Sequence, residues 1–292
     1  MARFTATSCV SALQLLEHLS PLSERWPEGQ FIFRGQPDAG FPLEPSAHRV
    51  NGLLTAPSLL GSKDVPTADQ IRFEADVLIR FLKGCDSSGL LVPGDSPAVR
   101  AELRNLDGFN AHPEQWPPKK VHVVLAVAQH HGIPTCLLDW SRRSYVAAYF
   151  AASSALHMDR QPEHIAVWAL DVSSTATWGA LSLVELPGGT SSNLAAQAGV
   201  FTVSQMQGEA LHTFLPVSVD QVSSVYRHEL SLQQFTLPFA EAPELLEACR
   251  RLGISGSTLF PGYEGVAREV KDWARISFKG FDPDEIGLRE LF

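Results

Sequence analysis

The sequence is poor in cysteine, in positive charge and in long apolar runs, and each shortage excludes a class of protein. Its 292 residues include 4 cysteines, far apart and without a Cys-x-x-Cys pair, so neither a disulfide scaffold nor a structural zinc site is expected. Lysine and arginine total 23 against 32 acidic residues, a net charge of -9. That balance argues against broad duplex binding, which needs a basic face. No stretch approaches the roughly 18 apolar residues of a membrane span.

What is present is typical of a globular chain. Hydrophobic residues make up 45% and charged residues 19%, enough to bury a sizeable core. The opening residues Met1-Ala2-Arg3-Phe4 lack the charged region and apolar run of a signal peptide. We therefore expect a soluble cytoplasmic protein with no membrane partner.

Apolar periodicity predicts both helices and strands. Helices are predicted over 9–19, 69–83, 119–131, 143–155, from Pro243 to Leu252, and around 266–273. Strands are predicted over 30–33, 137–138, 165–172, 200–203 and 225–237. Segments 51–68 and 187–193, rich in glycine and serine, are predicted to be loops. Because the two types are mixed without strict alternation, we expect an α+β fold with a mixed, mostly antiparallel sheet core and flanking helices.

The arrangement of the predicted elements along the chain suggests one main domain. We expect it over 30–275, preceded by a helical segment over 1–29 and followed by a tail, 276–292, packed on the domain. Residues 84–118 are rich in Gly, Pro and Asn and predict a mobile insertion with one short helix around 98–105.

Arg34 is the first candidate for a functional site. It is expected directly after a buried strand and before Gly35, where its guanidinium can fork onto a phosphate or carboxylate. Gly35 would let a ligand approach the backbone closely, and Gln36 continues the motif. The alternative is that Arg34 pairs with an internal acid such as Glu44.

A second candidate segment, Leu43 to Arg49, follows nine residues after Arg34. Ser46 is a candidate cap for a short helix whose first turn would hold His48 and Arg49, and Arg49 would add a second cationic contact. Ser46 is also a candidate ligand contact, as are Gln36 and Phe201. A solvated turn is the alternative.

Gln129-His130-His131-Gly132 ends the helix predicted over 119–131. A histidine there fits the helix dipole as a cap or packs in the core, and His130 is also a candidate ligand contact. Neighbouring side chains on a helix point about 100° apart, so the two histidines are badly placed to share one metal, and no metal site is expected.

Asp139-Trp140-Ser141 is expected at the start of a helix, where free N–H groups bind anions and a short oxygen side chain caps. The Trp140 ring would offer a flat face to a nucleobase or nicotinamide; a plain capped turn is the alternative. Further along, the Gln197 amide would orient a hydroxyl or carboxamide beside Phe201. Three glutamates are candidate bases or charge stabilisers in this half of the chain: Glu185, Glu209 and Glu229.

Together these motifs resemble the FRG domain, a family named for its Phe/Tyr-Arg-Gly motif. The resemblance rests on the following ordered blocks: Phe33-Arg34-Gly35-Gln36, Leu43-Glu44-Pro45-Ser46, Ala128 to Thr135, Leu137 to Ser141, Val146 to Ala151, Gln197-x-Gly199-x-Phe201, and Gly253-Ile254 through Leu259-Phe260-Pro261. Cys136 and Asn193 stand where the family often has arginine.

A remoter resemblance is to ADP-ribosyltransferases of the Arg-Ser-Glu type. It implies an ADP-ribosyltransferase-like fold with NAD as substrate or ligand, held at its phosphate or ribose by Arg34. Ser141 would match the serine block that positions the nicotinamide ribose. Gln197 falls where the glutamate would be, and an amide cannot act as a carboxylate; Glu229 or Glu185 would have to substitute.

Three hypotheses follow. The first is an ADP-ribosyltransferase or NAD glycohydrolase, acting as a toxin or phage-defence effector with a protein or nucleic-acid acceptor and a neutralising or regulatory protein as partners. The second is a non-catalytic nucleotide-sensing module. The third is a nuclease or other hydrolase that uses His130 or His131.

Overall fold

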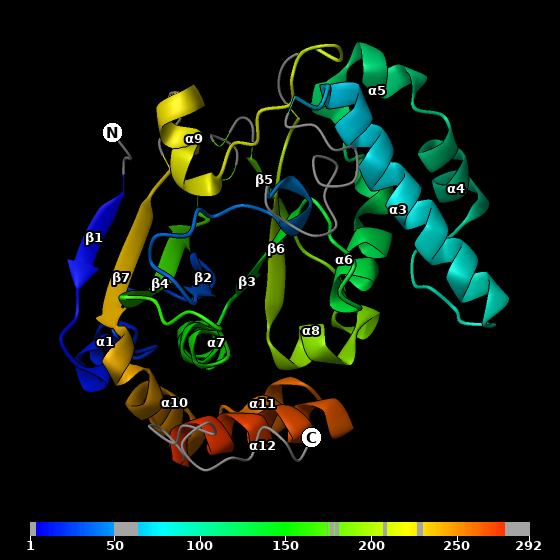
Figure 1. Cartoon of the computed structure of the whole chain (residues 1–292). Helices are drawn as coiled ribbons and strands as arrows, with labels where there is room; N and C mark the ends of the chain where they lie inside the picture. Colours follow the sequence, from blue (N-terminus) through cyan, green and yellow to red (C-terminus); the bar gives the residue numbers. More distant parts are fainter. Residues whose placement is uncertain are drawn as a thin grey trace.

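A seven-stranded sheet forms the centre of the molecule (Figure 1). The structure is a computed structural model that describes residues 4–49, 64–173, 175, 178, 181–206, 209–226 and 230–277. The strands are β1 (Thr5–Ser8), β2 (Phe31–Gln36), β3 (Leu137–Ser141), β4 (His164–Asp171), β5 (Leu181–Val184), β6 (Gly199–Ser204) and β7 (Leu232–Pro238). Their order is β1-β7-β4-β2-β3-β6-β5, with β1 parallel to β7 and the other pairs antiparallel. The expected α+β class with a mixed, mostly antiparallel sheet is confirmed.

The helices flank this sheet. They are α1 (Ala12–His18), α3 (Thr67–Ser87), α4 (Pro97–Arg104), α5 (Asp107–Ala111), α6 (His122–His130), α7 (Ser144–Leu156), α8 (Ser192–Ala196), α9 (Val219–Tyr226), α10 (Ala242–Arg251), α11 (Gly256–Leu259) and α12 (Tyr263–Ser277). Short 3-10 turns are η1 (Ser46–His48), η2 (Pro113–Gln115), η3 (Lys119–Val121), η5 (Gly188–Thr190) and η6 (Phe239–Glu241).

Strand β4 shows why the sheet is covered on both faces. Its side chains alternate between two apolar clusters, with Val167 facing α1, α7 and α10, and Trp168 facing the side that holds α9. Since successive strand residues point to opposite faces, a strand apolar at every position must be buried on both. The sequence predicted this central strand correctly.

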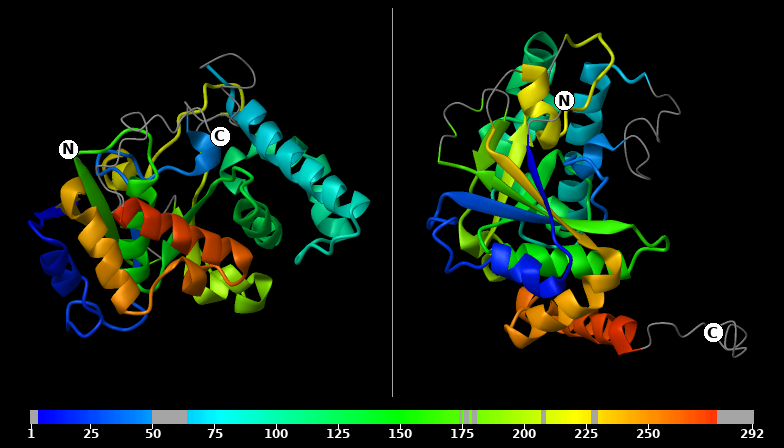
Figure 2. Two further views of the ribbon diagram at one scale, coloured as in Figure 1. Left: turned by 60° about the horizontal axis from the view of Figure 1, so that its bottom comes forward. Right: turned by 90° about the vertical axis from the view of Figure 1, so that its left-hand side faces the viewer.

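A third apolar cluster joins a helical arm to the sheet. The arm consists of α3, α4 and α5 and stands beside α6 (Figures 1 and 2). In this cluster the arm packs against β3 and β6. The cluster includes Ile71, Leu78, Leu103, Phe109 and Trp116 from the arm and its connections, Leu137 from β3 and Phe201 from β6. In the segment 84–118 the structure has the predicted short helix as α4, together with α5 and η2, all packed against α3.

Gly35 holds α7 close to the sheet. A Cβ added at this position would lie 2.0 Å from the Ala147 carbonyl oxygen and 2.5 Å from the Ala151 nitrogen. Only a residue without a side chain permits this approach. Gly35 is therefore needed for the packing of β2 against a helix, whereas the sequence suggested that it clears space for a ligand.

Strands β2 and β3 separate soon after they meet. They share one paired position, Phe33 opposite Ser141, while β2 continues to Gln36 fully paired with β4. On the other side, β3 stays paired with β6 over its whole length. The sheet is consequently split between β2 and β3, and side chains of both strands face the gap.

Several predicted boundaries were wrong. Arg34 lies within β2, opposite Trp168, and not after the strand. Asp139 and Ser141 belong to β3, so neither caps a helix; α7 begins at Ser144 without a side-chain cap. The predicted loop 187–193 contains η5 and the start of α8, and the predicted strand 225–237 is shortened to β7. Most of the predicted loop 51–68 and the tail from residue 278 onward lie outside the described residues.

Candidate functional site: a cavity in the split sheet

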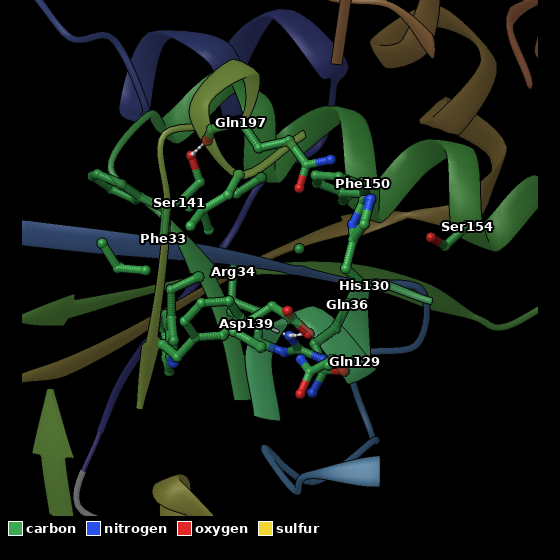
Figure 3. A pocket seen from close by; sticks show the side chains of 18 of the residues that line it. Phe33, Arg34, Gln36, Gln129, His130, Asp139, Ser141, Phe150, Ser154 and Gln197 are labelled. Carbon is green, nitrogen blue, oxygen red and sulfur yellow. Dashed lines mark hydrogen bonds and ion pairs between the residues drawn. The ribbon is translucent and has the colours of Figure 1, made fainter. Parts of the chain in front are cut away.

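A cavity of about 440 Å³ lies where β2 and β3 separate (Figure 3). Its walls come from both strands and from α6, α7, α8 and β6, together with Phe260 after α11. Nine of the predicted site residues line it: Arg34, Gly35, Gln36, His130, Asp139, Trp140, Ser141, Gln197 and Phe201. Ser46, His131, Glu185 and Glu209 are absent from its lining. Segments more than 200 residues apart in the sequence thus meet at one cavity.

Arg34 brings a nearly buried positive charge to this cavity. Its side chain is 15% exposed, and Nη1 donates a 2.7 Å hydrogen bond to the Asp139 carbonyl oxygen. The carboxylate of Asp139 is more distant, at 3.9 Å, and 61% exposed. Arg34 Nε is buried and makes no hydrogen bond within the described residues. The protein therefore leaves part of this guanidinium unsatisfied, which is costly unless a ligand completes it.

Burial lowers the pKa of Arg34 to about 10, although the neighbouring Asp139 raises it. Arg34 still carries its charge at neutral pH. Arg49 lines the same cavity and adds positive charge; its guanidinium donates to the Glu44 carbonyl oxygen at 3.3 Å. The alternative, that Arg34 pairs with an internal acid such as Glu44, holds only in part: the acid beside Arg34 is Asp139, whose carboxylate lies 3.9 Å away.

Trp140 lines the cavity but offers no open ring face. Its side chain is only 3% exposed, and Nε1 donates to Thr202 Oγ1 at 2.9 Å. As part of β3, the residue turns its indole into the core cluster on the α9 side of the sheet. The expectation that its ring is free to stack on a base is therefore wrong.

A hydrogen bond joins Ser141 to Gln197. Ser141 Oγ donates to the Gln197 carbonyl oxygen at 2.8 Å and accepts from the Arg143 N–H at 2.9 Å. The Gln197 side chain donates through Nε2 to the Leu259 carbonyl oxygen at 3.1 Å. These bonds tie the end of β3, the start of β6 and α11 together at one end of the cavity.

His130 is held from the other side of the cavity by Asn193. The Asn193 Nδ2 lies 3.0 Å from His130 Nε2, and this hydrogen bond orients the imidazole ring at the cavity wall. Partial burial and the nearby His131 lower the pKa of His130 below its ordinary value, consistent with a neutral ring. Asn193, which stands where an arginine was expected, thus positions His130. His131 instead stacks against Phe81 and is absent from the cavity lining.

Three other predicted contacts have structural roles. Gln36 Nε2 donates to the carbonyl oxygens of Phe41 and Pro42, and Phe201 is buried against the helical arm. Ser46 neither lines the cavity nor caps a helix: its hydroxyl forms hydrogen bonds with the backbone of Thr135.

Asp139 carries the only carboxylate among the described residues that line the cavity. Glu185 forms an ion pair with Arg142, and Glu209 is exposed beside His212; neither lines the cavity. Glu229 lies outside the described residues. Within the described chain, no group of three His, Cys, Asp or Glu side chains is arranged to hold a metal, and no helix is long and apolar enough to cross a membrane.

Sequence reasoning missed several aromatic residues of the site, among them Phe150 and Phe260. Both stood inside motifs that were noticed, Val146 to Ala151 and Leu259-Phe260-Pro261, but a half-buried phenylalanine gives no signal of its own. Gln129, whose Oε1 accepts from the Thr135 hydroxyl, also lines the cavity.

Comparison with known proteins identifies the family. The model of the FRG domain matches residues 29–160, which contain β2, α6, β3 and α7. The chain carries an FRG domain. No curated protein and no solved structure matches the chain. The matched part of the FRG domain supplies the Arg34 wall of the cavity, while Gln197 and Phe260 lie beyond the match.

Proposed function

We propose that this FRG domain binds NAD or a related nucleotide in the cavity of the split sheet, in the manner of an ADP-ribosyltransferase. The observation that carries the proposal is Arg34, a nearly buried guanidinium whose Nε lacks a partner within the described residues. Arg34 lines the cavity with its charge held only by a backbone carbonyl oxygen and by a carboxylate 3.9 Å away, and phosphate suits the forked geometry of arginine. The volume of about 440 Å³ falls in the usual range of small-ligand cavities.

The catalytic part of the proposal is cleavage of the bond between the nicotinamide nitrogen and ribose C1′. The bonding electrons leave with nicotinamide, and the oxygen of water or of a protein or nucleic-acid acceptor bonds to C1′ and releases a proton. Positive charge develops on the ribose during this step, so a carboxylate stabilises it. Asp139 is the group that we assign to this role among the described residues, with Glu229 as the alternative outside them.

Two measurements test binding and catalysis separately. Calorimetry with NAD and ADP-ribose is expected to show saturable binding that Arg34→Ala weakens about tenfold or more, the value of a charged hydrogen bond. Incubation with NAD is expected to release nicotinamide in wild type and much less in Arg34→Ala and Asp139→Asn. Equal release by all three proteins would contradict the catalytic assignment.

A second candidate is a nucleotide-sensing module without catalysis. It is favoured by Gln197, whose amide stands where the resemblance to ADP-ribosyltransferases expects a glutamate, and by the position of Glu185 outside the cavity. Saturable NAD binding without nicotinamide release would select this candidate. Nuclease chemistry by paired histidines is disfavoured, because His130 and His131 do not share the cavity.

The biological role as a toxin or phage-defence effector, controlled by a neutralising or regulatory protein, is a further part of the proposal. Expression in growing cells tests it: wild type is expected to arrest growth and deplete NAD, and Arg34→Ala is expected to do neither.

A further inference from the structure

The end of the cavity opposite Arg34 is built from parts of the chain beyond the matched FRG region. Gln197 lies near Phe150 of α7 there, whereas Arg34, Asp139 and Gln129 gather at the other end (Figure 3). Phe260 contacts the Phe150 ring. The Leu259-Phe260-Pro261 motif has no part in the phosphate site, so its presence at the cavity needs a separate explanation.

The two phenylalanine rings form a fixed apolar corner. Phe150 and Phe260 are half-buried, with ring centroids 5.9 Å apart and planes at 86°. The Arg268 guanidinium lies 4.4 Å from the centre of the Phe260 ring and helps to hold it. Partly exposed aromatic surface inside a cavity favours a flat apolar ring as ligand.

The backbone behind this corner is held rigidly. Glu269 accepts from Ser255 Oγ at 2.8 Å and from the Ser257 N–H at 3.2 Å, which fastens α11 to α12. A Cβ added at Gly265 would lie 1.9 Å from the Phe260 carbonyl oxygen, so the two elements pack at backbone contact. The corner is therefore in place before any ligand arrives.

Gln197 adds one directed polar group to the corner. Its Nε2 must be the atom that faces the Leu259 carbonyl oxygen, because a carbonyl only accepts. That bond fixes the amide, and its Oε1, without a hydrogen-bond partner in the described chain, lies beside Phe150 on the cavity side (Figure 3). An acceptor presented next to an apolar ring site selects a ring that carries a donor.

We infer that Phe150, Phe260 and Gln197 form a base subsite that selects a flat heterocycle bearing an NH₂ donor. The inference rests on the proposed function, since the ligand's phosphate is placed on Arg34. Two groups of NAD have this chemistry, the carboxamide of nicotinamide and the exocyclic amine of adenine. A ring that offers a methyl or a carbonyl group in that place would leave Oε1 desolvated and unpaired.

Calorimetry on the full chain with four ligands tests the subsite: NAD, ADP-ribose, the 3-acetylpyridine analogue of NAD, and the hypoxanthine analogue of NAD. The acetylpyridine compound replaces the carboxamide NH₂ by a neutral methyl group, and the hypoxanthine compound replaces the adenine amine by a carbonyl. One analogue is expected to bind about tenfold or more weakly than NAD, and it identifies the ring that occupies the subsite.

The variant Gln197→Met is expected to abolish this discrimination, with NAD weakened to the level of the poorer analogue and that analogue unchanged. Gln115→Met makes the same change at an exposed glutamine outside the cavity and is expected to behave like wild type. Thermal unfolding of both variants monitors their folding.

The outcomes separate the two proposals. Equal affinity of wild type for NAD and both analogues, with binding still lost in Arg34→Ala, overturns the subsite and leaves nucleotide binding intact. A uniform loss for all ligands in Gln197→Met also overturns it, because the residue then supports the cavity without selecting the ring. No saturable binding of NAD or ADP-ribose to wild type overturns both proposals.

Discussion

Two polar clusters in this protein treat a buried charge in opposite ways. The Glu74 carboxylate, 1% exposed, accepts hydrogen bonds from His48 at 3.0 Å, Gln70 at 2.8 Å and Trp116 at 2.7 Å. The Arg34 guanidinium donates one hydrogen bond, to a backbone carbonyl, and keeps a buried Nε without a partner in the described chain.

This difference in hydrogen bonding distinguishes a charge that holds the fold together from a charge that is a candidate for binding. Glu74 connects α3, η1 and the segment before η3, so its hydrogen bonds join the helical arm to the turn that carries Arg49. A charge that the protein satisfies by itself specifies packing, whereas we propose that a charge left incomplete at a cavity wall, at a cost in stability, is kept for a ligand. Four substitutions and conditions test this contrast, from the largest expected effect to the smallest.

Glu74→Ala is expected to lower the free energy of unfolding by about 3–5 kcal/mol, because it leaves three buried donors without their acceptor. Urea denaturation measures this change. Glu74→Gln, which keeps the volume and one acceptor, is expected to cost less. A loss below about 1 kcal/mol for Glu74→Ala would show that this cluster does not hold the arm.

Gly35→Ala is expected to cost about 3 kcal/mol, because its Cβ would collide with the backbone of α7 at Ala147 and Ala151. A loss of this size would show that Gly35, although it is next to Arg34, is needed for the packing of the fold. Gly84→Ala in α3 is the matched control, since no atom lies within 4 Å of its added Cβ. There we expect a gain of about 0.5–1 kcal/mol from helix propensity. Equal urea midpoints for the two variants would refute the close-packing explanation.

Arg34→Leu is expected to change the free energy of unfolding by less than about 1 kcal/mol, because the lost hydrogen bond is offset by relief of a desolvated charge. The pKa of Arg34 is lowered to about 10, mainly by burial, which means that folding disfavours the charged form of this side chain. Urea denaturation and calorimetry with NAD, run together, are expected to show intact stability and lost binding. Arg100→Leu, on the surface of α4, serves as control and is expected to bind normally. A stability loss comparable to that of Glu74→Ala would contradict the difference between Arg34 and Glu74, because Arg34 would then also be needed for the fold.

The acid range gives the smallest effect. Burial raises the pKa of Glu74, but hydrogen bonds from His48, Trp116 and Gln70 outweigh it and leave the pKa below the ordinary value of 4.5. The unfolded state therefore binds the proton first. Stability from this group is complete above about pH 4.5 and is lost as the pH falls through the lowered folded pKa. Urea midpoints from pH 5 to 3 are expected to fall less steeply in Glu74→Gln; identical slopes would contradict this role.

Periodicity predicted the long elements because they bury one face or two. The i, i+4 pattern around Leu78 located α3, and the continuous apolar run after His164 located β4. Strands β1 and β5 were missed because each has four residues and no clear alternation. Strand β1 forms only by parallel pairing with β7, so that Thr5 lies opposite Gln233, a contact that no local window contains.

The candidate site was predicted as a set of residues but not as a set of contacts. The motifs around Arg34, Asp139 and Gln197 do meet at one cavity. Which polar atoms are satisfied depends on partners far away in the sequence: Arg34 on the Asp139 carbonyl, Ser141 on the Gln197 carbonyl, and Gln197 on Leu259. For the same reason, Trp140 and Ser46 were taken for ligand contacts although the fold uses their polar groups internally.

The sequence by itself determined the family resemblance, the α+β class and the motifs around Arg34, Asp139 and Gln197 that reach the cavity, because these depend on local pattern and motif order. Only the tertiary structure decided that β2 and β3 separate after one paired position, and that Arg34 and Gln197 both line the cavity at this gap. The physical reason is that a hydrogen bond joins two groups, and whether a group finds its second partner depends on the whole chain.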